Sequence, residues 1–460
     1  MLHALRRFLA VTMGKILIMT GKLFGKHGSA APGKLAVRIA PDILRHLASQ
    51  VRREIIVVCG TNGKTTTNNF IYSLLHAGGH KVVCNRLGAN MLYGVVTAFV
   101  SAAKPSGRLD ADYACIELDE LSAAGVFEHL TPDCMVITNL FRDQLDRYGE
   151  IDIAINSLTR AVTMAEDATL ILNADDPLLA AMGKQCKSQC VYFGVNSEQP
   201  GNLPGGGVAS EAKEGRFCRL CGAELEYEAY YYSQIGRYAC PDCGFARPGP
   251  DYTAENIDLG SGIAFDVCTA STGGVENITA DYRGFYNIYN ILAAYAALRQ
   301  CGIVSDYINE VLALFRPQIG RMETFAVRGK KVILNLSKNP AGFNQAISTL
   351  IADERRKSAV LVINDNEQDG TDISWLWDVD FERLHGVSDI VVSGLRAKDM
   401  LLRMKYARFD MDSVYIDPQV KKAIDFALSG DCEVVYVLVN YTALFSTQAL
   451  LKKMERANKS

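Results

Sequence analysis

The chain lacks the features that mark several large classes of protein. It has no uninterrupted run of about 18 apolar residues, which argues against a membrane-spanning helix, and no internal repeat. Its formal charge of −3 gives no general electrostatic reason to expect nucleic acid as a partner. Thirteen cysteines, an odd number spread through apolar segments, do not indicate a disulfide framework, so a reducing cytoplasm is the expected location. With 460 residues, 49% of them hydrophobic, two or three globular domains are expected.

Residues 1–50 are predicted to form an N-terminal helical segment. Arg6 and Arg7 precede an apolar stretch, but Lys15 interrupts it and no clear cleavage site follows, so a signal peptide is not indicated. A helix packed on its own domain is the preferred interpretation. The alternative is an amphipathic helix lying at a membrane surface.

What the chain does contain is a phosphate-binding loop. The β-branched run Ile55–Val58 leads into Cys59-Gly60-Thr61-Asn62-Gly63-Lys64-Thr65-Thr66. A buried strand, a glycine loop and a helix start would together offer free backbone N–H groups to a phosphate. Lys64 would reach the β- and γ-phosphates of ATP, and the Thr65 hydroxyl would bind Mg²⁺. The expected ATP-binding residues are Gly60, Thr61, Asn62, Gly63, Lys64, Thr65 and Thr66, with Lys64 also acting in catalysis.

The predicted fold class is α/β, in two blocks. Apolar strands alternating with helical stretches predict a parallel sheet flanked by helices in residues 51–320; these strands are expected at 81–84, 113–117, 134–139 and 169–173. Helices are predicted at 41–51, 151–165 and 282–299. A C-terminal α/β domain, Rossmann-like in pattern, covers 321–460, with strands at 331–336, 359–363, 389–393 and 433–439.

Four cysteines predict a metal site inside the first block. Cys218-x-x-Cys221 and Cys240-x-x-Cys243 could place four thiolates at tetrahedral corners, with Gly222 and Gly244 allowing tight turns. The prediction is a structural zinc ribbon inserted at about 215–247. Redox-active CxxC pairs are the alternative, which the doubled spacing disfavours.

Carboxylates follow the strand at 113–117. Glu117, Asp119 and Glu120 stand where a nucleotide-binding sheet would place a Mg²⁺ ligand, and Glu117 is the best candidate. The alternative is a solvated acidic strand end.

The phosphate loop also departs from the general pattern, because Val58 stands where the first glycine should be. In this it resembles the loop of Mur ligases and folylpolyglutamate synthetases, which form an acyl phosphate and then an amide bond. The resemblance continues in family order through three segments: Thr138-Asn139 with Asp143-Gln144-Leu145-Asp146, Gly284-Phe285-Tyr286-Asn287-Ile288-Tyr289-Asn290, and Gly320-Arg321-Met322-Glu323.

This resemblance implies a Mur ligase-type ATPase domain and roles for three further residues. Gln144, where those enzymes usually carry a metal-binding histidine, would be a weaker Mg²⁺ ligand. Asn287 would lie near the adenine and Arg321 would face the phosphates. For Asn290, one helical turn further on, a role beside the nucleotide and a role in packing or capping stay equally open. Lys338-Asn339-Pro340, in the place of the family's H-N-P segment, and Tyr441-Thr442-Ala443 are candidates to line the cleft.

A short N-terminus, the cysteine quartet and the block 364–378 together resemble the MurT family, the synthetase subunits of lipid II isoglutaminyl synthase. The resemblance implies ATP-dependent amidation of the D-glutamate α-carboxyl of lipid II, in peptidoglycan biosynthesis at the inner face of the plasma membrane. It also implies a heterodimer with a GatD-like class I glutaminase that supplies ammonia. Asp365, Asp369 and Asp372 are candidates to orient the partner's catalytic histidine, and Asp365 ranks first because it lies nearest the strand end.

Three further interpretations stay open at this point. The chain could be a stand-alone ligase that adds an amino acid, or a binding protein that uses ATP only as a conformational ligand. Trp375 and Trp377 could belong to an interface or to the core. The cysteines show no glutaminase nucleophile signature, so ammonia would come from solution or from another chain.

Overall fold

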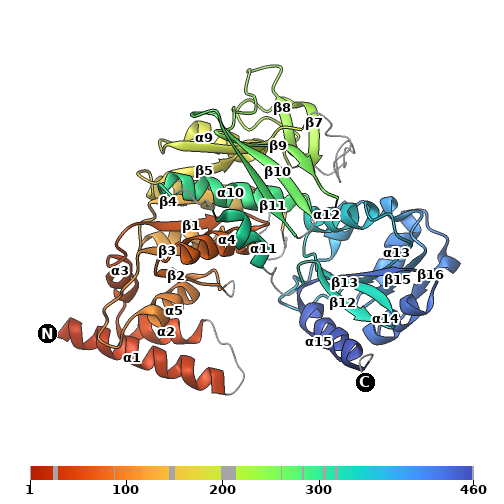
Figure 1. Cartoon of the computed structure of the whole chain (residues 1–460), viewed down its shortest axis with the longest axis horizontal. Helices are drawn as coiled ribbons and strands as arrows, with labels where there is room; N and C mark the ends of the chain where they lie inside the picture. Colours follow the sequence, from red (N-terminus) through yellow and green to blue (C-terminus); the bar gives the residue numbers. More distant parts are fainter. Residues whose placement is uncertain are drawn as a thin grey trace.

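The computed structural model describes residues 2–23, 30–86, 89–143, 151–197, 214–260, 262–281, 284–303, 307–315 and 320–457. Gln144, a predicted Mg²⁺ ligand, lies outside these residues. Figure 1 shows a central α/β domain, an N-terminal group of helices at one side of it, and a C-terminal α/β domain at the other.

The N-terminal segment forms three helices, α1 (Leu2–Leu23), α2 (Ala31–Ile39) and α3 (Ile43–Ala48). Helix α1 packs against α2 and against α5 (Leu92–Ala102) of the central domain. The preferred interpretation of this segment, a helix packed on its own domain, agrees with these contacts. Helix α3 is shorter than the predicted 41–51. Among the described helices, none combines the length and the apolar character needed to span a bilayer.

The central domain is built on a nine-stranded sheet in the order β11-β10-β9-β6-β5-β4-β1-β3-β2. Its first six strands in the chain are parallel: β1 (Ile55–Cys59), β2 (Val82–Cys84), β3 (Tyr113–Glu117), β4 (Cys134–Ile137), β5 (Thr169–Asn173) and β6 (Cys190–Val195). Strand β1 is buried along its whole length, as its unbroken apolar run predicts for a central parallel strand.

Both faces of this sheet are covered by helices, which gives the domain two cores. Ile55 and Val57 face a core shared with α3, α5, α6 (Ala123–Phe127), α8 (Ile151–Met164) and α9 (Pro177–Gln185). Ile56 and Val58 face the other core, built on α4 (Lys64–Ala77), α10 (Tyr286–Gln300) and α11 (Ile308–Leu314). The alternation along one strand thus divides its side chains between two layers.

The prediction of a purely parallel sheet was incomplete. After the cysteine-rich insertion, which contains β7 (Glu226–Tyr232) and β8 (Ile235–Ala239), three more strands extend the sheet. Strand β9 (Tyr252–Asp258) is parallel to β6, whereas β10 (Ile263–Thr269) and β11 (Gly274–Ala280) are antiparallel additions. Helix α10 begins at Tyr286, later than the predicted 282, and β4 ends two residues before the predicted 139.

The C-terminal domain has a six-stranded sheet in the order β12-β13-β17-β14-β15-β16. Its strands are β12 (Glu323–Val327), β13 (Lys330–Leu336), β14 (Lys357–Val362), β15 (Asp389–Ser393), β16 (Val414–Ile416) and β17 (Val434–Val439). Its helices are α12 (Pro340–Ile351), α13 (Ala397–Tyr406), α14 (Val420–Ser429) and α15 (Tyr441–Ala457), with short helices η2 (Ser374–Asp378), η3 (Phe381–Leu384) and η4 (Met411–Ser413). All pairs except β12–β13 are parallel, which confirms the predicted α/β class.

Candidate active site

The phosphate loop joins β1 to α4, and its glycines have positive φ angles of 115° at Gly60 and 86° at Gly63. Neighbouring polar groups approach both glycines closely. A Cβ at Gly60 would lie 2.4 Å from Thr138 Oγ1, and one at Gly63 would lie 2.0 Å from Asn290 Oδ1. Glycine is therefore required at both positions, for conformation and for space.

Two residues that follow β4 hold the loop from the sheet side. Thr138 Oγ1 donates to Asn62 O at 2.7 Å, and Asn139 Oδ1 accepts from Asn62 N at 2.9 Å. The backbone O of Asn139 also accepts from Thr61 N at 2.8 Å. The strand ends at Ile137 because the next two residues turn their polar groups to the loop.

Lys64 is buried at the start of α4. Its ammonium Nζ donates to Gly60 O at 2.5 Å, to Thr61 O at 3.3 Å and to Glu120 Oε1 at 3.0 Å. Burial by itself lowers the pKa of Lys64, but the surrounding carboxylates, first Glu120 and then Glu117, raise it above its usual value. Lys64 is thus a charged group in a low-dielectric environment, where its attraction to an anion is strong.

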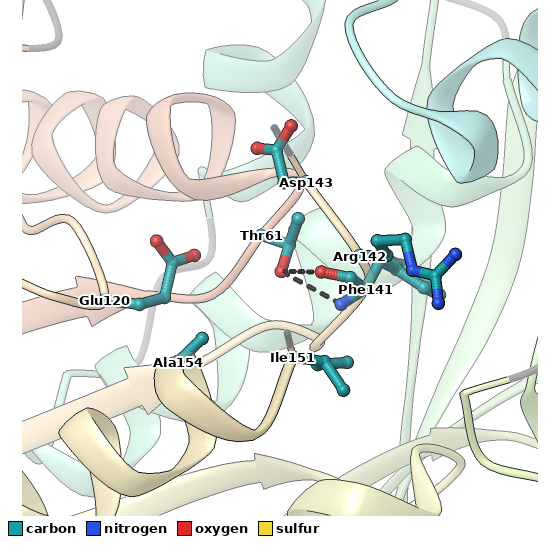
Figure 2. Close-up of a pocket in the computed structure, with 7 residues that line it drawn as sticks. All are labelled: Thr61, Glu120, Phe141, Arg142, Asp143, Ile151 and Ala154. Atoms are coloured by element: carbon teal, nitrogen blue, oxygen red, sulfur yellow. Dashed lines mark hydrogen bonds between the residues drawn. The ribbon is translucent and has the colours of Figure 1, made fainter. Parts of the chain in front are cut away.

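Sequence reasoning considered Glu120 only as one of three acids beside a possible Mg²⁺ site and did not predict its contact with Lys64. Its pairing with Lys64 depends on the loop geometry after β3, which the pattern of residues does not give. Figure 2 shows Glu120, Thr61 and Asp143 around a pocket beside the loop, together with Phe141, Arg142, Ile151 and Ala154. The Thr61 hydroxyl bonds both the O and the N of Phe141, which fixes this wall of the pocket.

Glu117 and Asp143 each present a carboxylate oxygen that has no partner. Glu117 is 2% exposed, and its Oε1 accepts from Asn90 Nδ2 at 3.3 Å. Among the described residues, Glu117 Oε2 and Asp143 Oδ1 are buried atoms without a hydrogen-bond partner. A buried carboxylate oxygen without a partner is costly unless a cation meets it, so these residues fit a site for Mg²⁺.

Helix α10 supports the loop from the opposite side. Asn290 is 3% exposed, and its Nδ2 donates to Asn287 Oδ1 at 3.0 Å. Because its own Oδ1 lies against Gly63, Asn290 packs on the loop, one of the two roles considered for it. Asn287 is also buried, while Arg321 lies near Tyr286 and acts on it electrostatically.

The C-terminal domain reaches the same loop through the residues before α12. The amides of Asn62 and Asn339 bond each other reciprocally at 3.3 and 3.1 Å. Asn339 also accepts from Gly342 N at 2.9 Å, which caps α12. Lys338 pairs with Asp143, and Arg142 pairs with Asp378 at 3.2 Å. The candidate segment at 338–340 thus lies against the phosphate loop.

The three candidate aspartates have different surroundings. Asp365, partly exposed, pairs with Arg396 at 2.6 Å. Asp369 is buried and accepts from Thr442 N at 2.8 Å and from the Thr442 hydroxyl. Asp372 accepts from Ser374 N at 2.7 Å at the start of η2. Through Thr442, Asp369 therefore connects the segment that follows β14 with the segment that follows β17, whereas Asp365 is more accessible to solvent.

Of the two interpretations of the tryptophans, core or interface, Trp375 fits the core, and Trp377 is exposed enough to belong to an interface. Trp375 is buried against Phe343, with ring centroids 5.7 Å apart. Trp377 is half exposed beside Tyr406 and Arg403. Tyr441 is also exposed, while Ala443 is buried in the core.

The cysteine quartet converges at one point. The ligand atoms of Cys218, Cys221, Cys240 and Cys243 all lie within 4.8 Å of one another. Cys218 Sγ lies 3.6 Å from Cys243 Sγ, and Cys221 Sγ lies 3.5 Å from Cys240 Sγ. Tetrahedral Zn–S bonds of about 2.3 Å would set the sulfurs about 3.8 Å apart. The donor set and its geometry fit a closed structural zinc site.

A buried polar network, which sequence reasoning missed, connects this insertion to α10. Asp175 is fully buried after β5 and accepts from Arg247, from Tyr289 OH at 2.7 Å and from Val195 N at 2.7 Å. Burial raises the pKa of Asp175, an effect that Arg247 opposes. Two adjacent aspartates in segment 173–176 were a sequence signal for a polar cluster, but the residues that Asp175 contacts lie far away in sequence.

Two family models match the chain: the Mur ligase middle domain over residues 58–239 and the MurT ligase C-terminal domain over 336–444. The chain is 35% identical over 448 residues to the lipid II isoglutaminyl synthase (glutamine-hydrolyzing) subunit MurT of Staphylococcus aureus strain COL, and 96% of each chain is covered. The chain belongs to the MurT family. A second MurT subunit, from Streptococcus pneumoniae, is 34% identical over 94% of each chain.

Solved structures agree on the fold of this MurT family member. A pseudomurein peptide ligase type C from Methanothermus fervidus matches with a TM-score of 0.70 and 24% identity, covering 89% of this chain and 80% of the other. The MurF ligase of Thermotoga maritima, solved in complex with ADP, matches with a TM-score of 0.63 and 15% identity over 93% and 85%. The predicted Mur ligase-type fold is confirmed.

Replacing Gly63 with alanine should abolish ATP binding. The added methyl would collide with Asn290 Oδ1 and would also disfavour the positive φ. Isothermal titration with ATP checks this. Gly79→Ala is the matched control, because Gly79 has a φ of 80° but nothing within 4 Å of its Cβ position. If Gly63→Ala bound ATP as tightly as the Gly79→Ala control, the loop would tolerate the displacement and the prediction would be wrong.

Purified protein should contain about one zinc ion per chain. Cys221→Ser combined with Cys243→Ser removes two of the four thiolates, so metal analysis should find no zinc and the melting temperature should fall. Cys268→Ser, on β10 outside the quartet, should retain the zinc. A wild-type protein that folds and stays metal-free in zinc-supplemented medium would contradict the assignment.

Proposed function

We propose that this chain is the ATP-using subunit of a lipid II isoglutaminyl synthase and amidates the D-glutamate α-carboxyl in the stem peptide of lipid II. The names of its MurT relatives support the reaction. The structural observation that carries it is the buried Lys64 ammonium, which lies among loop carbonyls and interacts electrostatically with Glu117, whose Oε2 has no hydrogen-bond partner among the described residues. This arrangement is suited to phosphoryl transfer, in which the protein mainly positions groups and neutralises charge.

In the proposed first step, the loop N–H groups and Lys64 bind the phosphates of ATP. The Lys64 ammonium would turn from Glu120 to the phosphate oxygens, whose negative charge attracts it strongly in this buried site. Thr65, Glu117 and, by the family pattern, Gln144 would hold Mg²⁺, which neutralises charge developing on the transferred phosphoryl group. Asn287 is proposed to lie near the adenine, and Arg321 to face the phosphates.

The substrate carboxylate would then attack the γ-phosphorus, so that ADP leaves and an acyl phosphate forms. Ammonia would attack the acyl carbon, inorganic phosphate would leave, and the nitrogen would lose a proton to give the amide. Lys338 and Asn339 already lie against the loop, so the C-terminal domain would exclude water from this intermediate.

Ammonia is proposed to come from a partner subunit, a GatD-like class I glutaminase, because the relatives are named as subunits of a glutamine-hydrolysing enzyme. Asp365 is the preferred residue to orient the partner's histidine, ahead of Asp372. Asp369 is less suited, since Thr442 already uses both of its oxygens. A lipid-borne substrate places the reaction at the inner face of the plasma membrane.

Lys64→Ala should lower ATP-dependent amidation of lipid II by a factor of about 10² or more, the scale seen when one charge-stabilising donor is lost. Lys81→Ala, an exposed lysine with 60% of its side chain accessible, is the matched control and should keep full activity. Amidation is followed by mass spectrometry of the stem peptide, with the partner and glutamine present. If ATP is bound but never turned over by the wild-type complex, ATP is only a conformational ligand. Addition of free amino acids without a partner would instead favour a stand-alone ligase.

Asp365→Asn should reduce glutamine-supported amidation about tenfold or more, by analogy with the general role of a histidine-orienting carboxylate. Ammonium chloride should restore the rate, because the ATP site is intact. Asp399→Asn is the control: Asp399 contacts the same Arg396, at 3.7 Å, but lies on α13. If Asp365→Asn also lost the amidation that ammonium chloride supports, Asp365 would not act through the glutaminase partner.

A further inference from the structure

Helix α1 presents large apolar side chains to solvent. Seven of them are between 37% and 66% exposed: Leu5, Phe8, Leu9, Met13, Ile16, Leu17 and Met19. Spaced at three and four residues, they share one side of the helix. A surface helix normally turns such a face toward the core, so this orientation needs an explanation.

The opposite side of α1 is firmly packed, and its contacts are made by small residues. Ala10, Val11 and Gly14 are buried against the domain. A Cβ at Gly14 would lie 2.8 Å from Val100 of α5, which shows how closely the two helices approach. Arg7 pairs with Asp42, and Lys15 Nζ donates to Ser101 O at 2.7 Å. The helix is therefore fixed with its large side chains outward.

The charge of this region is of one sign. Residues 1–41 contain no Asp or Glu, although the chain as a whole has a formal charge of −3; their basic residues are Arg6, Arg7, Lys15, Lys22, Lys26, Lys34 and Arg38. Arg6 is exposed on α1 itself, and Lys34 and Arg38 are exposed on α2. An apolar face accompanied by these exposed cations is complementary to a lipid surface with anionic headgroups.

The fold also makes this face accessible. In Figure 1, α1 lies at the outer margin of the molecule, and α2 and α5 separate it from the central sheet. The phosphate loop lies on the far side of those helices, so that a surface contacting α1 would not cover the loop.

We propose that α1 docks the protein on an anionic membrane, with Leu5, Leu9, Met13 and Ile16 entering the boundary between headgroups and acyl chains. Arg6, Lys34 and Arg38 contact the headgroup phosphates. The benefit of this docking rests on the proposed function, because docking would bring the active site to a lipid-borne carboxylate. The physical docking itself needs neither ATP nor substrate.

The test uses the full chain and vesicles of phosphatidylglycerol with phosphatidylcholine, compared with phosphatidylcholine alone, in a sedimentation assay without lipid II. Wild-type protein should bind the anionic vesicles, and high salt should weaken the binding as the headgroup charge is screened. Leu9→Gln combined with Ile16→Gln should weaken it about tenfold or more, because two buried apolar side chains are lost. Val275→Gln with Leu314→Gln is the matched control, as both residues are exposed apolar side chains elsewhere, at 62% and 78%.

Arg6→Glu is a second variant that reverses one charge, and it should weaken binding to anionic vesicles while leaving the circular dichroism unchanged. Amidation of lipid II in detergent should be equal in wild type and in the Leu9/Ile16 variant, so a failure of the proposed reaction is seen separately from a failure of docking. The inference is overturned if wild-type protein does not bind anionic vesicles, or if the Leu9/Ile16 variant binds as well as wild type. A dimer that depends on Leu9 and Ile16, without vesicle binding, would show that a second copy covers the face.

Discussion

The rest of the active site depends on how the loop from Gly60 to Lys64 is held. Asn139 accepts from the N–H groups of Thr61 and Asn62, and other contacts fix the loop through its remaining atoms. Thr138 and Asn139 hold it from the sheet, Asn290 from α10, and Asn339 from the C-terminal domain. These contacts come from chain segments that are separated by up to 277 residues. A preorganised loop of this kind need not be ordered by its ligand, which lowers the cost of binding.

The buried charge of Lys64 sets the electrostatics around this loop. Four carboxylates, those of Glu120, Glu117, Asp119 and Asp143, act electrostatically on Lys64, and Glu120 pairs with it directly. The other two acids at this strand end differ in their partners: within the described part of the chain, Glu117 Oε2 has no hydrogen-bond partner, whereas Asp119 Oδ1 accepts from Leu121 N. Within four residues of one strand end, the arrangement separates the acid that pairs with Lys64 from the acid proposed to bind Mg²⁺.

Local patterns were sufficient to predict much of this molecule. The loop, the strand β3 with its acids and the cysteine quartet each lie within a short stretch, where residue type and spacing determine geometry. Features that depend on distant partners were not predictable. Nothing near Glu120 indicates that it faces Lys64, and nothing near Arg247 indicates Asp175. Likewise, β9 to β11 follow an insertion whose composition hid the return of the chain to the same sheet. The Asp365 block was located by resemblance, but the surroundings that distinguish its three aspartates came only from the fold.

The insertion with the cysteine quartet is connected to the nucleotide site through a continuous set of buried contacts. Arg247 follows the last cysteine closely and pairs with Asp175, which accepts from Tyr289, and the next residue, Asn290, lies against Gly63. Tyr238, just before the third cysteine, donates to Ala174 O at 3.0 Å. The Arg247–Asp175 pair therefore ties the insertion to the packing of α10 against the phosphate loop. A displacement of the insertion would reach the nucleotide site through Tyr289 and Asn290.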